Sequence, residues 1–96
     1  MIKEVFVKIY GRVQGIGYRR WAVSRAEEIG GISGWVHNEC DGSVEILMRG
    51  EEEAVDKMIL ACHTGPSLAR VDSVNFVVGR LSGFLPPIAD GVFKRV

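Results

Sequence analysis

Residues 5–31 read VFVKIYGRVQGIGYRRWAVSRAEEIGG, and this stretch changes from one hydrophobic period to another. Apolar residues occupy every second position in residues 5–10, which is typical of a strand with one buried face. Three glycines follow within residues 11–17 and predict a loop. Over residues 18–29 the apolar residues recur at helical spacing, and the glycine pair 30–31 ends the helix. The stretch therefore predicts a strand, a glycine loop and an amphipathic helix in succession.

The remaining sequence predicts a similar order of elements around a hairpin. Residues 32–49 contain two alternating runs joined by the Asp-Gly pair 41–42, which favours a two-stranded hairpin. A second amphipathic helix is expected over residues 51–62, with three glutamates at its positive N-terminal end. Residues 74–78 alternate as a fourth strand, and residues 92–96 are expected to form a short edge strand. The predicted order is β-α-β-β-α-β with a short fifth strand.

This order predicts an α+β protein with the ferredoxin-like split βαβ architecture, in which two helices cover one face of an antiparallel or mixed sheet. Right-handed crossovers are expected to place the first and third strands side by side and parallel. The fourth strand should then flank the first, and the second should flank the third. Pro86 and Pro87 exclude a central strand, and they leave the conformation of residues 81–91 and the register of the last strand open. A chain of 96 residues holds one core, so a single domain over residues 1–96 is expected.

Composition and charge exclude several classes of function. The 12 Lys and Arg residues balance 12 Asp and Glu residues, so the chain lacks the net positive field of a general nucleic-acid or anionic-membrane binder. No apolar run approaches the roughly 20 residues that span a bilayer, and no apolar signal core follows the N-terminus. We therefore expect a cytoplasmic protein that binds neither nucleic acid nor membrane.

The cysteines and histidines suggest neither a disulfide nor a metal site. Cys40 and Cys62 lack the spacing of zinc ligands and are expected to be reduced, as in a cytoplasmic protein. His37 and His63 are far apart in the sequence, and no Asp, Glu or Cys set accompanies them. Neither a metal ion nor a cofactor is therefore expected.

The glycine loop and the helix start that follows it, residues 11–20, form the first candidate site. Unpaired backbone amides in a glycine-rich turn at a helix N-terminus bind anions, above all phosphate. Neither a Walker Gly-Lys-Ser/Thr sequence nor the third glycine of a dinucleotide-binding motif is present. Arg19 and Arg20 lie in the first helical turn, where cations oppose the helix dipole. A bound anion would remove this conflict, so the segment is interpreted as an anion site. The simplest alternative to an anion site is an ordinary turn with two solvated arginines.

The second candidate site is the sequence GWVHN at residues 34–38. Gly34 within a strand indicates close backbone approach or helix packing. Asn38 ends the strand just before the Asp-Gly turn, a place where asparagine is common. On its own, Asn38 is therefore more simply interpreted as a plain turn residue than as a functional one.

Together the two motifs resemble those of the acylphosphatase family. The family pattern is Gly-x-Val-Gln-Gly-Val-x-Phe/Tyr-Arg followed by Gly-Trp-Val-x-Asn. This chain has GRVQGIGYR at residues 11–19 and GWVHN at residues 34–38. The resemblance extends from residue 4 to about residue 78 in the order of elements. It implies the ferredoxin-like fold and an enzyme that hydrolyses acyl phosphates to a carboxylate and inorganic phosphate, without a metal or cofactor.

The resemblance also implies roles for individual residues. Arg19 would bind the substrate phosphate, and Asn38 would orient the attacking water. A guanidinium fork matches two phosphate oxygens, and an amide can accept a hydrogen bond from water without acting as a strong base. The backbone amides that would complete the phosphate cradle belong to Gly15, Ile16, Gly17 and Tyr18. The expected partners are an acyl phosphate substrate and inorganic phosphate as product and inhibitor, with the chain acting as a monomer.

Other functions remain open at this point. Glu39 follows Asn38, where family members commonly carry a small hydroxyl residue, and a carboxylate there would mildly repel an anion unless it points away. The same fold could serve as a non-catalytic phosphate-binding regulatory module, although such a module has less need of Asn38 beside Arg19. RNA binding is disfavoured, because the third strand lacks outward aromatic residues. The related domain of a hydrogenase-maturation protein would be expected to continue into a much longer sequence, whereas this one ends at Val96.

Overall fold

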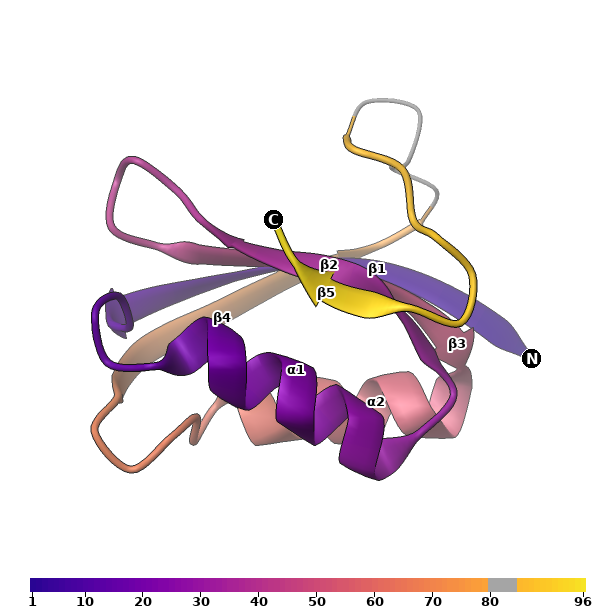
Figure 1. Ribbon diagram of the computed structural model, residues 1–96, viewed down its shortest axis with the longest axis horizontal. Helices are drawn as coiled ribbons and strands as arrows, with labels where there is room; N and C mark the ends of the chain where they lie inside the picture. Colours follow the sequence, from indigo (N-terminus) through magenta and orange to yellow (C-terminus); the bar gives the residue numbers. More distant parts are fainter. Residues whose placement is uncertain (80–84) are drawn as a thin grey trace.

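Both predicted helices form and pack on the same face of one sheet (Figure 1). The computed structural model describes residues 1–79 and 85–96. In chain order the elements are β1 (Ile2–Arg12), α1 (Tyr18–Ile29), β2 (Ile32–Asn38), β3 (Val44–Glu51), α2 (Glu52–Cys62), β4 (Arg70–Val78) and β5 (Phe93–Arg95). Residues 85–91 contain no helix or strand, which agrees with the exclusion of a central strand by Pro86 and Pro87, while residues 80–84 lie outside the described part of the chain. The ferredoxin-like α+β prediction is confirmed, including the short fifth strand.

Periodic burial explains why these elements form. On β1, the side chains of Val5, Val7 and Ile9 are fully buried in the core between sheet and helices. The helices contribute residues at spacings of three and four to the same core: Tyr18, Ala22 and Ala26 from α1, and Val55, Met58, Ile59 and Cys62 from α2. Each large apolar side chain buried in this way stabilises the fold by about 1.5–3 kcal/mol. The core therefore lies between one face of the sheet and both helices.

The sheet order is β4-β1-β3-β2-β5. β1 and β3 are antiparallel, with Ile2 opposite Glu51 and Ile9 opposite Val44, so the prediction of a parallel pair was wrong. The α1 crossover makes β1 and β2 parallel, and the tight turn at residues 39–43 then reverses the chain. β3 therefore enters between them antiparallel to both. The predicted neighbours were correct, because β4 flanks β1 and β2 flanks β3.

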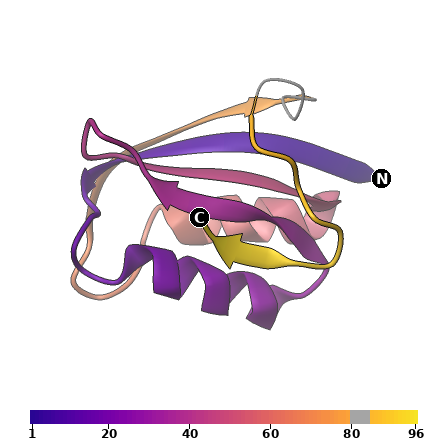
Figure 2. The ribbon, with the colours of Figure 1, turned by 45° about the horizontal axis from the view of Figure 1, so that its top comes forward.

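The last strand, β5, adds parallel to the outer edge of β2 (Figure 2). Phe93 pairs with Gly34, Arg95 pairs with Val36, and Phe93 is buried in the main core. The backbone N–H of Val96 also donates to the carbonyl oxygen of Val36 at 3.0 Å. The C-terminal residues consequently run along the strand that ends at Asn38.

Within residues 1–79 and 85–96, no helix has the length and apolar content that a membrane crossing requires. Both cysteines are free thiols, as predicted, with Cys40 exposed and Cys62 buried. Burial raises the pKa of the Cys62 thiol to about 12, so this group stays protonated and unreactive near neutral pH.

Gly34 lies where β2 and β3 approach too closely for a side chain. Its φ is +157°, and a Cβ built there would lie 2.0 Å from the carbonyl oxygen of Leu47. We expect Gly34→Ala to lower the free energy of unfolding by about 3 kcal/mol or more, because the opposing backbone cannot move aside cheaply. Urea unfolding followed by circular dichroism measures this loss. Ser24→Ala on the exposed side of α1 is the control, expected within about 0.5 kcal/mol of the wild type, and equal stability of the two variants would contradict the clash.

Candidate active site

Four segments meet beside the C-terminal end of β1 and line a cavity of about 360 Å³. The segments are the glycine loop after β1, the first turn of α1, the end of β2 and the end of β5. The lining residues are Val13, Gly15, Gly17, Tyr18, Arg19, Arg20, Asn38 and Arg95. Residues from both sequence motifs therefore reach a single cavity.

The loop has a backbone shape that glycine adopts far more easily than other residues. Gly15 and Gly17 have φ angles of +75° and +84°, in the left-handed region. A Cβ at either position would meet no atom within 4 Å, so glycine is favoured there for its backbone conformation and not for lack of space. Gly17 is also the N-cap of α1, and no side chain caps the helix there. The first-turn amides thus lack the side-chain acceptor that commonly caps a helix, an arrangement that suits an anion.

Gln14 ties this loop to the turn between β2 and β3. Its Nε2 donates hydrogen bonds to the carbonyl oxygens of Glu39, at 2.7 Å, and of Ser43, at 2.8 Å. Because Glu39 directly follows Asn38, these bonds hold the loop at a set distance from Asn38. No role for Gln14 was predicted, although its place inside the first motif pointed to one.

Three arginines line the cavity, and none of them pairs with a carboxylate of the described residues. Arg19 is half-buried, Arg20 is exposed, and Arg95 enters from β5. In the described part of the chain, no Asp or Glu oxygen lies within 4.0 Å of any of these guanidinium groups, and no acidic residue lines the cavity. The cavity is therefore locally positive although the net charge of the chain is zero. Arg95 was missed by the sequence analysis because no local pattern links the C-terminal residues to the loop.

Asn38 brings a buried acceptor without a partner to this cavity. It is the last residue of β2, and its Oδ1 is buried with no hydrogen-bond partner among residues 1–79 and 85–96. An unpaired buried acceptor costs about 1–3 kcal/mol. A ligand or water that donates a hydrogen bond to Oδ1 would remove this cost. The amide oxygen can orient such a donor but cannot take its proton near neutral pH.

Tyr18 has a structural role through its side chain. Its hydroxyl donates to the carbonyl oxygen of Cys62 at 2.8 Å, and its ring packs edge-on against Trp21 at 5.2 Å. Burial raises the pKa of Tyr18, so the phenol remains protonated and can keep donating. This bond anchors the start of α1 to the end of α2 and thereby holds the first-turn amides in place.

The other residues singled out from the sequence lie outside the cavity lining. The side chain of Ile16 packs against the main core. Glu39 turns away, because its Oε1 accepts the N–H of Cys40 at 3.1 Å and its Oε2 lies 3.4 Å from Nε2 of His37. The repulsion expected from a carboxylate beside an anion site is therefore reduced.

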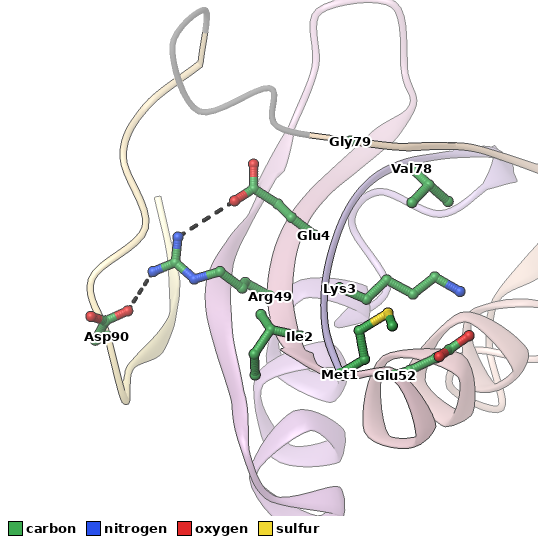
Figure 3. A pocket seen from close by; sticks show the side chains of 9 residues that line it. All are labelled: Met1, Ile2, Lys3, Glu4, Arg49, Glu52, Val78, Gly79 and Asp90. Atoms are coloured by element: carbon green, nitrogen blue, oxygen red, sulfur yellow. Dashed lines mark hydrogen bonds and ion pairs between the residues drawn. The ribbon is translucent and has the colours of Figure 1, made fainter.

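A larger cavity of about 880 Å³ lies at the opposite end of β1, near the N-terminus (Figure 3). Its arginine, Arg49, already forms ion pairs with Glu4, at 3.4 Å, and with Asp90. Among residues 1–79 and 85–96, no glycine loop or helix N-terminal turn with free cations borders it. The smaller cavity is therefore the better candidate for anion chemistry.

The chain is similar in sequence to known acylphosphatases. A family model described as acylphosphatase matches residues 5–84. The acylphosphatase of Rhodospirillum rubrum is 48% identical over 73 residues, which cover 76% of this chain and 79% of that protein. The acylphosphatase of Rhodopseudomonas palustris strain BisB5 is 53% identical over 73 residues, covering 76% of this chain and 71% of that protein.

A solved structure extends the likeness to three dimensions. The crystal structure of acylphosphatase from Bacillus subtilis superposes with a TM-score of 0.84 at 30% sequence identity. The alignment covers 100% of this chain and 99% of that one. The similarity therefore includes the C-terminal strand as well as the two motifs.

Proposed function

This chain belongs to the acylphosphatase family and hydrolyses acyl phosphates, and from that premise we propose that the reaction takes place in the 360 Å³ cavity between the glycine loop and Asn38. The observation that carries this proposal is that cationic side chains and an unpartnered acceptor of the described residues line the same cavity. The arginines of the cavity, which no carboxylate of the described residues pairs with, are suited to phosphate, and the buried Oδ1 of Asn38 is suited to a water.

The phosphate group binds to the loop and to Arg19. The amides of the residues from Gly15 to Tyr18 donate to its oxygens at the positive end of α1. The Arg19 guanidinium holds two oxygens with its planar fork and neutralises charge that spreads over them in the transition state. Arg19 is the most buried of the three arginines, so water weakens its interaction least.

The attacking water is held by Asn38. Oδ1 accepts one water hydrogen and aims the water oxygen at phosphorus, opposite the acyl oxygen. A new P–O bond forms as the bond between phosphorus and the acyl oxygen breaks, and the carboxylate departs with the electron pair. A phosphate oxygen takes the water proton, so no side chain needs to act as a strong base. Because a carboxylate leaves readily, no general acid is needed either, and catalysis rests on positioning and charge stabilisation.

Hydrolysis of benzoyl phosphate in the presence of a chelator tests this proposal. We expect release of benzoate and phosphate, with inorganic phosphate as a competitive inhibitor. A non-catalytic phosphate-binding module would bind phosphate without hydrolysing benzoyl phosphate. Such a module would not need the Oδ1 of Asn38 to hold an attacking water. Phosphate binding without any hydrolysis would therefore overturn the proposed catalytic site.

Arg95 brings a further cation to the cavity from β5. Because it is exposed, we expect its attraction to act on substrate and transition state alike. Arg95→Gln should raise KM for benzoyl phosphate about 5- to 10-fold and change kcat less than about threefold. Lys94→Gln, on the neighbouring position of β5, is the matched control and should leave both constants near wild type. An unchanged KM in Arg95→Gln would remove Arg95 from the site.

We also infer the oligomeric state and the cellular compartment of the enzyme. The groups that the proposed reaction uses, which are the loop amides, Arg19 and Asn38, all belong to the same chain and reach the same cavity, so we infer that a monomer is able to catalyse the reaction. The two free thiols suit a reducing compartment, and we place the enzyme in the cytoplasm. Size-exclusion chromatography of the active fraction tests the first inference.

A further inference from the structure

A cluster of metal-ligating side chains lies next to the active site and has no part in the proposed reaction. His37, Glu39 and Glu45 each place one ligand atom within 4.8 Å of the others. The absence of a metal site was expected because no Asp, Glu or Cys set was seen to accompany His37. The structure shows such a set, because the register of the hairpin pairs His37 on β2 directly with Glu45 on β3.

The ligand atoms of the cluster lie close enough together for one metal ion to reach all three after small side-chain shifts. Nε2 of His37 lies 2.9 Å from Oε1 of Glu45 and 3.4 Å from Oε2 of Glu39. Ligand atoms at about 2.1 Å from a tetrahedral ion are separated by roughly 3.4 Å. The same imidazole nitrogen faces both carboxylates, so a small shift of the side chains would let all three reach one ion.

The surroundings hold these ligands in place. The Trp35 ring meets the His37 ring edge-on, with centroids 5.5 Å apart. The Glu45 side chain is only 12% exposed, and its second oxygen lies 3.4 Å from Nζ of Lys8. These contacts restrict both side chains before any ion binds, which lowers the entropic cost of binding.

The local charge also favours a cation. Glu39, Asp41 and Glu45 surround Lys8 and His37, and Lys8 lies 3.2 Å from Asp41. With a neutral imidazole, Lys8 compensates only one of the three carboxylates.

We propose that His37, Glu39 and Glu45 bind one divalent transition-metal ion of the Zn²⁺ type on the sheet face opposite the helices. One imidazole and two carboxylates are ligands that Zn²⁺ accepts, with water completing the coordination. The site is distinct from the catalytic cavity, because His37 and Asn38 point to opposite faces of β2. His37 and Glu39 nevertheless flank Asn38, so a bound ion would tie the end of β2 to β3 at the position of that residue.

Calorimetric titration of ZnCl₂ into chelator-treated protein without a histidine tag tests the proposal. We expect one ion per chain, and we expect His37→Gln and Glu45→Gln each to weaken binding by about 10-fold or more. His63→Gln is the matched control for His37, since it removes the other histidine, and Cys40→Ser excludes coordination by the nearby exposed thiol. Both controls should bind Zn²⁺ as the wild type does. Zn²⁺ should also raise the Tm of the wild type but not that of His37→Gln.

Three results would overturn the metal site. The first is no saturable Zn²⁺ binding by the wild type up to millimolar concentration, which would leave the cluster as an ion-pair network. The second is unchanged affinity in Glu45→Gln, a variant that keeps the shape of the side chain. The third is loss of binding in His63→Gln or Cys40→Ser. Circular dichroism shows whether each variant is folded. If either His37→Gln or Glu45→Gln fails to fold, the Zn²⁺ affinity of the other variant still tests the site.

Discussion

Arg19→Ala is expected to lower kcat/KM for benzoyl phosphate by about 10³-fold or more, the range seen when a charge-stabilising arginine is removed from a phosphoryl-transfer site. Arg19 is half-buried in the cavity, and no carboxylate among the described residues pairs with it. Its removal therefore takes away both the charge and the fork that hold the phosphate. Inhibition by inorganic phosphate should weaken in parallel, because the product uses the same contacts.

Arg20→Ala is the matched control for this prediction. Arg20 also lines the cavity, but it is exposed and lies about 100° around the helix from Arg19, so both cannot easily face one anion. We expect Arg20→Ala to keep most of the activity. Arg19→Lys should recover only part of it, since an ammonium restores charge without the planar pair of donors. If Arg20→Ala proved the more damaging change, the assignment of Arg19 would be wrong.

Asn38→Ala is expected to lower kcat by about 10²-fold or more, the usual loss when a group that positions a reactant is removed. In the proposed site Asn38 holds water and does not touch the phosphate. The inhibition constant of inorganic phosphate should therefore stay near the wild-type value. This separation of kcat from phosphate binding distinguishes Asn38→Ala from Arg19→Ala, in which both are lost.

A purely structural Asn38 would behave differently. Its Oδ1 is buried and unpartnered in the described part of the chain, so alanine removes an unfavourable group and should cost little stability. If Asn38 were only a turn residue, the folded fraction of Asn38→Ala would turn over at nearly the wild-type rate. Measuring kcat, phosphate inhibition and the urea midpoint on the same preparation decides between the two roles.

Much of the candidate site could be predicted from the sequence because its main signals are local. The positive φ angles of Gly15 and Gly17 belong to the loop itself, and glycine is the residue that permits them. Arg19 stands in the first turn of a helix, where its conflict with the helix dipole is visible from sequence alone. The sequence supported the role of Asn38 less strongly, because the residues next to it are typical of an ordinary turn. Only the combination of the two motifs indicated a functional role for Asn38.

The elements and their order could be predicted from local patterns, since hydrophobic period and glycine conformation depend on residues within a few positions of one another. Which distant residues meet depends instead on how the elements are arranged in the folded protein. The antiparallel pairing of β1 with β3, the entry of Arg95 on β5 and the pairing of His37 with Glu45 all depend on strand direction and register. Register is a relation between segments separated along the chain, and a shift by one residue moves every side chain to the other face. The alternation within one strand does not show which strand lies beside it or in which register, so these contacts are defined only once the strands are placed in one sheet.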